Sequence, residues 1–319
     1  MKIAFRHVPF SAGQIEKLNA LAAQGGYETL WCKNGAIPPA QELQDCEILM
    51  GYFPADLIQS LPNLKWVQTP AAGVEKLCGD IYRNSDALLT NCSGAFGVAI
   101  SEYMISGLLM LMRNMPAYLQ NQRAHVWECV GCCRSIYGST ITVIGMGNIG
   151  SEFAARAKAM GAYIRGVRRT MSALPANFDE VYTSDRLAEA VQGADAVVMC
   201  LPGTAATTGM VSKEVIDAMG PNTILVNCGR GYTIDQQALT EALQEKRIAG
   251  AVLDVFETEP LDSGSPLWDM KNVIITPHIS GHDDDPVNIS FIYEIFADNL
   301  SRWIHGQPLT HVVDRTRGY

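Results

Sequence analysis

At 319 residues the chain is long for a single hydrophobic core, so two domains are expected. Hydrophobic residues make up 48% and charged residues 18% of the sequence, a composition that supports packed cores and excludes a mainly disordered chain. The formal net charge of -9 argues against binding to nucleic acid, because nucleic-acid-binding surfaces are usually basic.

The N-terminal residues MKIAFRHV predict a first buried strand and not a targeting signal. The longest uncharged apolar run lies between Glu102 and Arg113 and is too short to span a bilayer. We therefore expect a cytoplasmic protein that has no contact with membranes.

Short apolar segments alternate with helical stretches in the first third of the chain. This alternation favours a parallel sheet that is covered by helices on both faces. Strands are expected at residues 3–5, 29–31, 48–50, 66–68 and 88–90, with helices such as 11–23 and 54–61 between them.

A long apolar helix is expected over residues 98–120, leading from one domain into the next. Six further strands with helices between them then indicate a doubly wound dinucleotide-binding domain. These strands are expected at residues 140–144, 163–167, 196–201, 223–227, 251–254 and 273–276, with helices such as 151–160 and 235–245. A last helix, at 287–305, could return to the first domain, so the dinucleotide domain is expected as an insertion.

The motif GMGNIG, Gly145 to Gly150, follows a predicted strand and opens an alanine-rich helix. In that context Gly145 permits a tight turn, Gly147 lets the backbone approach a pyrophosphate, and Gly150 allows close packing of helix and strand. The N-terminus of the helix offers free N–H groups to phosphates. A dinucleotide site is therefore predicted here.

The end of the next strand indicates which dinucleotide binds. NAD sites place an acidic residue about 20 residues after the glycine motif, where it binds the ribose hydroxyls. This chain has Arg168 and Arg169 there, and guanidinium groups pair with a 2′-phosphate. We therefore predict a preference for NADP(H), with NAD(H) also possible; the alternative is a solvated basic loop.

Three polar residues in the second half of the chain each lie in an apolar frame: Arg230 in VNCGRG, Glu259 in LDVFETEPL and His278 in ITPHISG. Reduction of a 2-keto acid needs these side chains. Arg can hold the carboxylate and polarise the ketone, His can donate a proton, and Glu can keep that His protonated. Each residue alone has a structural explanation, but together with a nucleotide motif they predict an active site.

The nine cysteines are mostly in apolar strand-like segments, which favours buried free thiols. Cys129, Cys132 and Cys133 form the one cluster. A redox or metal site is possible for such a C-x-x-C pair, but no second pair or His doublet completes it, so the cluster favours incidental thiols and no metal is predicted.

With these residues in hand, the chain resembles the D-2-hydroxyacid dehydrogenase family, which includes glyoxylate/hydroxypyruvate reductases and D-lactate and D-phosphoglycerate dehydrogenases. The motifs that carry the resemblance run in order along nearly the whole chain: QTPAAGVEKL, GMGNIG, VMCLPGTAATTGM, VNCGRG, LDVFETEPL, TPHISG and PLTHVVDRTRGY. The resemblance implies a flavodoxin-like substrate domain of residues 1–97 and 286–319, an inserted Rossmann NAD(P)-binding domain of residues 98–285, and a homodimer.

The resemblance also implies roles for individual residues. Arg230 would clamp the carboxylate and carbonyl oxygen of a 2-keto acid, His278 would be the general acid in the reduction, and Glu259 would hydrogen-bond His278. The main chain of Ala72, Gly73 and Val74 would bind the substrate carboxylate. The dinucleotide-lining positions would be Gly145, Gly147, Asn148, Ile149, Gly150, Arg168, Arg169, Leu201, Pro202, Thr207, Cys228, Gly229, Arg230, Asp254, His278, Ser280 and Gly281.

Several points stay open at this level. Tyr52 and Phe53 follow a predicted strand and either line the substrate pocket or pack in the core. His282, which precedes the acidic run 283–285, faces either the pocket or solvent. The keto acid is glyoxylate, hydroxypyruvate, pyruvate or a bulkier one. The alternatives to a reductase are a nicotinamide-sensing regulatory protein and a dehydrogenase of a phosphorylated hydroxy acid or of formate.

Overall fold

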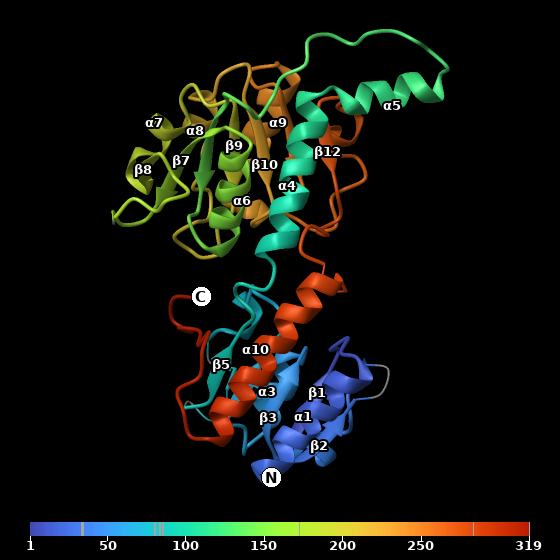
Figure 1. The fold of residues 1–319 in the computed structure, drawn as a ribbon, viewed down its shortest axis with the longest axis vertical. Coiled ribbons are helices and arrows are strands. Elements are labelled where there is room, and N and C mark those ends of the chain that lie inside the picture. The colour runs from blue at the N-terminus through green and yellow to red at the C-terminus, as the bar shows by residue number, and fades with distance from the viewer. Residues whose placement is uncertain are drawn as a thin grey trace. The chain divides into compact units, whose positions relative to one another are not determined.

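The computed structural model of the chain describes residues 1–32, 35–79, 81–82, 84, 86–171, 173–282 and 284–318, and the main chain alone at residue 40. Contacts within the chain divide it into unit 1, Met1–Phe96 with His282–Tyr319, and unit 2, Gly97–Gly281. Each unit contains one parallel sheet with helices packed on it (Figure 1). The predicted fold class, two doubly wound α/β domains, is confirmed.

Unit 1 has a five-stranded sheet with the order β2-β1-β3-β4-β5, and every pair of neighbours is parallel. This is the flavodoxin-like strand order. The interior strand β1 is apolar on both faces, since Ile3, Ala4 and Phe5 are all fully buried. The strands are β1 (Lys2–Arg6), β2 (Glu28–Trp31), β3 (Cys46–Gly51), β4 (Trp66–Gln68) and β5 (Leu88–Thr90).

The helices of unit 1 have start signals in the sequence. Helix α1 begins with a capping box, in which Ser11 and Gln14 each bind the main chain of the other. Helix α10 begins with Asp285 as its N-cap and Pro286 as its first residue. The helices are α1 (Ala12–Gln24), α2 (Ala40–Leu43), α3 (Ala55–Ser60), the 3-10 turn η2 (Glu75–Leu77) and α10 (Pro286–Ile304).

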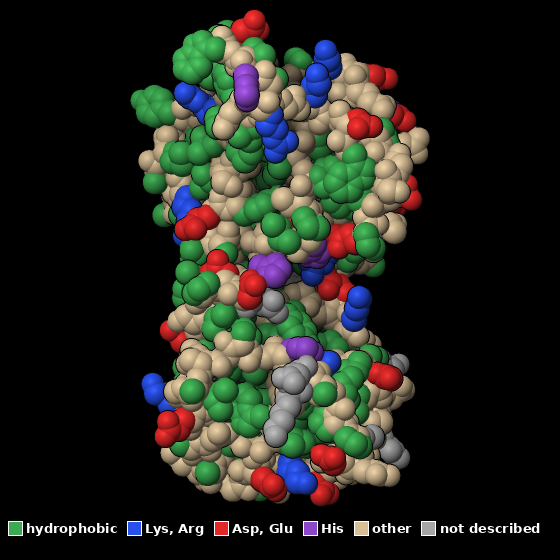
Figure 2. Space-filling view, turned by 90° about the vertical axis from the view of Figure 1, so that its right-hand side faces the viewer, with side chains coloured by type: hydrophobic (Ala, Val, Ile, Leu, Met, Phe, Trp, Pro, Cys, Tyr) green, Lys and Arg blue, Asp and Glu red, His purple; other side chains and the backbone are tan. Residues whose placement is uncertain are grey.

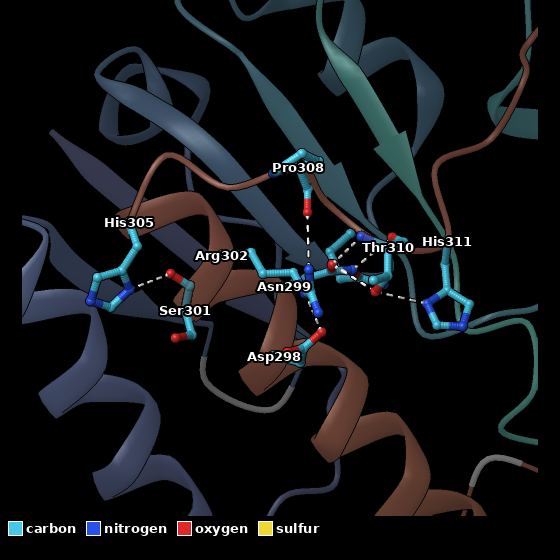
Figure 3. Close-up of polar contacts among 9 residues, drawn as sticks. Asp298, Asn299, Ser301, Arg302, His305, Pro308, Thr310 and His311 are labelled. Atoms are coloured by element: carbon cyan, nitrogen blue, oxygen red, sulfur yellow. Dashed lines mark hydrogen bonds and ion pairs between the residues drawn. The ribbon is translucent and has the colours of Figure 1, made fainter.

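A buried amide network joins α10 to the sheet of unit 1. Asn299 Nδ2 donates to Gln68 Oε1 at 2.9 Å. Asn299 Oδ1 accepts from the N–H of Thr310 at 2.8 Å (Figure 3). Gln68 Oε1 also accepts from Thr90 Oγ1 at 2.7 Å. Because the side chains of Gln68 and Asn299 are fully buried and bonded, they fix the end of β4 without leaving a polar group unsatisfied.

Unit 2 has a seven-stranded parallel sheet with the order β12-β11-β10-β9-β6-β7-β8. The order reverses between β6 and β9, which is the switch point at which Rossmann folds bind dinucleotides. The sequence predicted six of these strands and missed β8, whose pattern has only one buried residue. The strands are β6 (Thr140–Ile144), β7 (Tyr163–Arg168), β8 (Glu180–Thr183), β9 (Ala196–Met199), β10 (Ile224–Asn227), β11 (Gly250–Leu253) and β12 (Val273–Ile275).

The helix predicted over residues 98–120 is wrong in its extent, because the chain breaks into α4 and α5 there. Asn114 has a left-handed φ of 56°, and its side chain donates to the carbonyl of Val130 at 2.7 Å. Pro116 has no N–H for the carbonyl of Met112, which accepts from the N–H of Arg134 at 2.8 Å instead. The helices and 3-10 turns of unit 2 are α4 (Gly97–Met112), α5 (Met115–Arg123), α6 (Asn148–Ala159), η3 (Ser184–Arg186), α7 (Leu187–Val191), α8 (Lys213–Asp217), η4 (Gly231–Thr233), α9 (Gln236–Gln244) and η5 (Pro266–Asp269).

The surface of the molecule carries charges of both signs. Figure 2 shows Lys and Arg side chains interspersed with Asp and Glu side chains over one face. In the part of the chain that the structure describes, every helix falls short of the length and apolar character that crossing a bilayer requires.

Candidate functional site

The predicted site residues of unit 2 follow the carboxyl ends of parallel strands. GMGNIG comes after β6, Arg168 ends β7, and Arg230 follows β10. Asp254 follows β11, and His278 follows β12. Because all seven strands run in the same direction, these positions lie at one edge of the sheet.

The turn from β6 into α6 has the shape that a pyrophosphate requires. Gly145 has φ 101°, and a Cβ added to it would meet the Cys200 carbonyl oxygen at 2.7 Å. A Cβ on Gly150 would meet the Gly145 oxygen at 2.0 Å, whereas one on Gly147 would meet nothing within 4 Å. Among the described residues, no hydrogen bond uses the first N–H groups of α6. The turn is tightly packed at Gly145 and Gly150, and the first N–H groups of α6 have no partner among the described residues, so the turn fits a dinucleotide phosphate.

The loops after β9 and β10 lie against each other beside this turn. A Cβ on Gly229 would meet the Leu201 oxygen at 2.8 Å, so only glycine fits. Thr207 Oγ1 donates to the Pro202 carbonyl at 2.6 Å and so closes the loop after β9. Cys228 is buried, and burial raises the pKa of its thiol, with the Asp254 carboxylate raising it further. The predicted dinucleotide-lining residues of these two loops therefore come together.

Arg168 and Arg169 lie at the end of β7, the strand next to β6. Arg168 is half-buried, and Arg169 is exposed. The two residues thus lie at the sheet edge beside the glycine turn, where a Rossmann fold places the ribose of the adenosine half.

A buried carboxylate organises the end of β12. Asp254 is fully buried, and its Oδ1 accepts from Thr276 Oγ1 at 2.6 Å and from the N–H of Ile279 at 2.8 Å. Its Oδ2 accepts from the N–H of Ser280 at 2.8 Å. The carbonyl of Asp254 accepts from the N–H of His278 at 2.9 Å. His278 takes a left-handed φ of 56°, a strained conformation that these bonds hold.

His278 and Glu259 form a hydrogen-bonded pair. His278 Nδ1 and Glu259 Oε2 are 2.8 Å apart, and Glu259 Oε1 accepts from the N–H of Phe256 at 3.0 Å. The side chains of His278 and Glu259 are 48% and 37% exposed. The carboxylate is thus held by its own loop, while the imidazole remains accessible through its other nitrogen.

Arg230 lies on a loop that contacts the segment before Glu259. A Cβ on Gly231 would meet the carbonyl carbon of Phe256 at 1.8 Å, so the two loops touch at that point. The Arg230 carbonyl accepts from Thr233 Oγ1 at 2.6 Å, and Arg230 Nη1 donates to the Gly229 carbonyl at 2.9 Å. The three residues that the sequence singled out are therefore on adjoining loops of unit 2.

The loop 71–74 of unit 1 presents unused main-chain donors. Among the described residues, no hydrogen bond uses the N–H groups of Ala72, Gly73 or Val74. Asn91 Nδ2 donates to the Ala72 carbonyl at 2.8 Å, and the N–H of Cys92 donates to the Ala71 carbonyl at 3.0 Å. Two carbonyls of this loop are thus bonded to the residues that follow β5, while the three N–H groups have no partner among the described residues, as an anion-binding nest requires.

Sequence reasoning missed Asn91 and Tyr103. Tyr103, on α4, has its hydroxyl 2.5 Å from Thr276 Oγ1, which also bonds Asp254, and burial raises the pKa of Tyr103. The sequence signal for Tyr103 was its hydroxyl group within the otherwise apolar segment that forms α4. Tyr52 is half-buried, whereas Phe53 belongs to the core of unit 1.

The sequence left open the roles of the cysteine cluster and of His282. Cys129, Cys132 and Cys133 are exposed, and among the described residues no three His, Cys, Asp or Glu side chains gather as metal ligands. His282 Nδ1 lies 2.5 Å from Asp284 Oδ1 on exposed side chains. The rest of the predicted acidic run includes Asp283, which lies outside the described residues.

The fold of unit 2 and its glycine turn define a dinucleotide-binding α/β protein. The model of the D-isomer specific 2-hydroxyacid dehydrogenase NAD binding domain matches residues 105–280. The chain is 32% identical over 252 residues to an (S)-sulfolactate dehydrogenase of Chromohalobacter salexigens, covering 77% of this chain and 80% of the relative. It is 30% identical over 262 residues to a D-3-phosphoglycerate dehydrogenase of Methanocaldococcus jannaschii, of which it spans 49%.

Solved structures agree with these relatives. A D-isomer specific 2-hydroxyacid dehydrogenase family protein of Aeromonas salmonicida has 33% identity and a TM-score of 0.84, over 98% of this chain and 99% of that one. A D-isomer specific 2-hydroxyacid dehydrogenase of Xanthobacter autotrophicus, in complex with NADPH and MES, has 26% identity and a TM-score of 0.83 over 100% and 99%. The chain therefore belongs to the D-isomer specific 2-hydroxyacid dehydrogenase family, as its motifs predicted.

The Asp254 cluster generates a stability prediction. In Asp254→Asn an NH2 group replaces one carboxylate oxygen and faces the main-chain N–H of residue 279 or that of residue 280, according to which oxygen it replaces. We expect the free energy of unfolding to fall by roughly 2–4 kcal/mol, because buried donors lose their partners. Urea denaturation measures it. Asp269→Asn, at an exposed site, should change stability by less than about 0.5 kcal/mol, and equal midpoints for the two variants would contradict the role of Asp254.

Proposed function

We propose that the chain catalyses the reversible reduction of a small 2-keto acid to a D-2-hydroxy acid with NADP(H). The hydrogen bond between His278 and Glu259, at the sheet edge that carries the glycine turn, is the observation that supports this most directly. A dehydrogenase needs such an acid–base pair beside the turn that binds its dinucleotide.

The proposed proton path uses one nitrogen of His278. When bound, the nicotinamide supplies the hydride that adds to the carbonyl carbon. Because Nδ1 is engaged by Glu259, Nε2 of protonated His278 donates a proton to the carbonyl oxygen. The imidazole is left neutral and takes a proton from solvent; in the reverse direction Nε2 accepts the proton of the hydroxyl. Glu259 stabilises the imidazolium and fixes the ring.

Two groups are proposed to hold the keto acid. The guanidinium of Arg230 would pair with the substrate carboxylate and polarise the carbonyl oxygen, since its planar donors fit both acceptors. The unused N–H groups of Ala72, Gly73 and Val74 would bind the carboxylate. Tyr52 is proposed to line the pocket for the substrate side chain, and this proposal is supported by its position after β3.

The cofactor proposal is NADP(H), with NAD(H) as the weaker substrate. The main chain of residues 145–150 would hold the pyrophosphate, and the loops after β9 to β12 would line the remainder of the site, with Ser280 and Gly281 near the nicotinamide. Arg168 and Arg169 would pair with the 2′-phosphate. The NADPH bound to the relative from Xanthobacter autotrophicus supports this assignment.

A regulatory protein that only senses nicotinamide is less favoured. Such a protein needs no proton donor, whereas here a strained turn holds an accessible His278 against a carboxylate.

The first prediction from this proposal concerns proton donation. In His278→Ala we expect kcat to fall roughly 10²- to 10⁴-fold, because the general acid is lost. The Kd for NADPH, measured by fluorescence titration, should change by less than about threefold because the glycine turn is untouched. His305→Ala, at the exposed end of α10, is the control and should leave kcat unchanged. Near-normal turnover of His278→Ala would refute the proton-donor role.

The second prediction concerns the cofactor. The wild-type kcat/KM for NADPH should exceed that for NADH by about tenfold or more, and Arg168→Ala should lower the NADPH value by roughly 10- to 100-fold, the worth of a charge-assisted hydrogen bond. Arg186→Ala serves as the control, because it removes a different guanidinium of unit 2, the one that pairs with Glu189. A wild-type preference for NADH would overturn the proposal.

We propose a homodimer as the assembly. Helix α5 and the connection that follows it extend beyond the helices that cover the sheet of unit 2 (Figure 1). They expose Met115, Leu119, Val126 and a fully exposed Trp127. Several exposed apolar side chains on one projecting segment favour contact with a partner, and a second copy is the partner that the family resemblance implies.

The assembly is tested by light scattering. Wild-type protein at micromolar concentration should have twice the mass of one chain, and Trp127→Ser combined with Leu119→Ser should have the mass of one chain, since the apolar contact is lost. Trp268→Ser, another exposed tryptophan of unit 2, should leave the mass unchanged. A monomeric wild type would contradict the proposal.

A further inference from the structure

Arg6 holds a guanidinium over the carboxyl edge of the unit 1 sheet. It is the last residue of β1, the strand between β2 and β3. Its Nε donates to the carbonyl of Gly35 at 2.9 Å, and its Nη1 donates to the carbonyl of Tyr52. Gly35 follows β2 and Tyr52 follows β3, so the half-buried guanidinium bridges the ends of the three strands.

Two glycines make room for this turn. Gly51 has φ 129°, and a Cβ on it would meet the Arg6 carbonyl oxygen at 1.8 Å. Gly35 has φ 67°, and a Cβ on it would meet the ring of His7 at 1.9 Å. The N–H of Tyr52 donates to the Arg6 carbonyl at 3.2 Å. The guanidinium position is therefore fixed by the backbone on both sides of β1.

Among the described residues, no carboxylate forms an ion pair with Arg6. Its two acceptors are neutral carbonyls, and none of the ion pairs between described residues includes it. Guanidinium groups have further N–H donors, which the two hydrogen bonds leave available. Partly buried charges are ordinarily paired, so a fixed, unpaired guanidinium at a ligand-binding edge is suited to an anion.

The anion-binding nest at residues 72–74 lies on the same edge, after β4. Strand β3 separates β1 from β4, and neighbouring strands are about 4.8 Å apart. Because Arg6 reaches to the carbonyl of Tyr52 at the end of β3, its guanidinium is roughly one strand spacing from the end of β4. The nest begins at Ala72, on the loop that leaves β4 after Gln68, so the guanidinium and the nest lie over the same edge of the unit 1 sheet.

We propose that Arg6 is a specificity-determining residue that binds a second anionic group at the far end of the keto acid. The inference rests on the proposed reductase function and deepens it. The substrate class is then a 2-keto acid with a distal carboxylate, sulfonate or phosphate, and its neutral counterparts are poor substrates. The nest at 72–74 takes the 2-carboxylate, and Arg6 takes the distal anion.

The test compares matched pairs of keto acids with NADPH. The pairs are 2-oxoglutarate with 2-oxopentanoate, sulfopyruvate with 2-oxobutyrate, and phosphohydroxypyruvate with hydroxypyruvate. In wild type, kcat/KM should be about tenfold or more higher for the anionic member of at least one pair. The pair with the largest ratio identifies whether the distal group is a carboxylate, a sulfonate or a phosphate. Equal or reversed ratios in all three pairs would overturn the proposal.

Variants separate a specificity role from a structural one. Arg6→Gln should lower kcat/KM for the preferred anionic substrate by roughly 10- to 100-fold, mainly through KM, and change that for its neutral partner by less than about threefold. Arg6→Lys keeps the charge and should retain part of the selectivity. Arg165→Gln is the control, because Arg165 also donates to two carbonyls, those of Ala190 and Gln192. A parallel loss for both members of the pair in Arg6→Gln would show that Arg6 only supports the fold.

A binding measurement keeps this inference distinct from the proposed function. If no keto acid is reduced, the proposed function fails, and the shift in Tm decides the inference. 2-Oxoglutarate should then raise the Tm of wild type more than 2-oxopentanoate does, and Arg6→Gln should abolish the difference. Equal shifts would overturn the inference. Turnover of neutral keto acids alone would leave the proposed function standing and would overturn only the role of Arg6.

Discussion

The carboxylate of Asp254 is the interaction on which the candidate site depends. It is fully buried and accepts three hydrogen bonds from the segment that begins with Thr276. A buried carboxylate without such donors would be costly, so its burial and its bonds require each other. The bonds hold the chain in a turn that places His278 at positive φ, and only from that turn does the imidazole meet Glu259 at 2.8 Å.

The other parts of the site need little beyond the parallel sheet. Parallel strands bring residues that are distant in sequence to one edge, and close backbone contacts then fix the loops there. Gly150, Gly229 and Gly231 each allow a contact that a Cβ would block. The loops are thus located by packing of main chain against main chain, which leaves the polar side chains and N–H groups available for a ligand. This preorganisation is what electrostatic catalysis requires.

Sequence alone predicted the fold class, the glycine turn and the family, because each has a local pattern with a physical cause. It failed where the cause was not local. Strand β8 has one buried residue and so lacks an apolar signature, and the break at Asn114 depends on carbonyls of Val130 and Cys132. Asp254 was expected only to line the dinucleotide site; its bonds to the turn at His278 were not predicted, since they join segments that follow two different strands. Arg6 lies outside every motif that the sequence analysis identified.

The difference between the units follows from the same reasoning. In unit 2 the proposed catalytic residues lie in recognisable sequence motifs, because a proton donor and its carboxylate must be particular residue types. In unit 1 the proposed ligand-binding groups are largely main-chain N–H groups and a guanidinium held by carbonyls, which many sequences can provide. Gly35 and Gly51, 29 and 45 residues after Arg6, determine where that guanidinium lies, and nothing in their spacing marks them as related. The proposed reaction type can therefore be read from sequence motifs, whereas the proposed substrate choice depends on the geometry of the unit 1 edge.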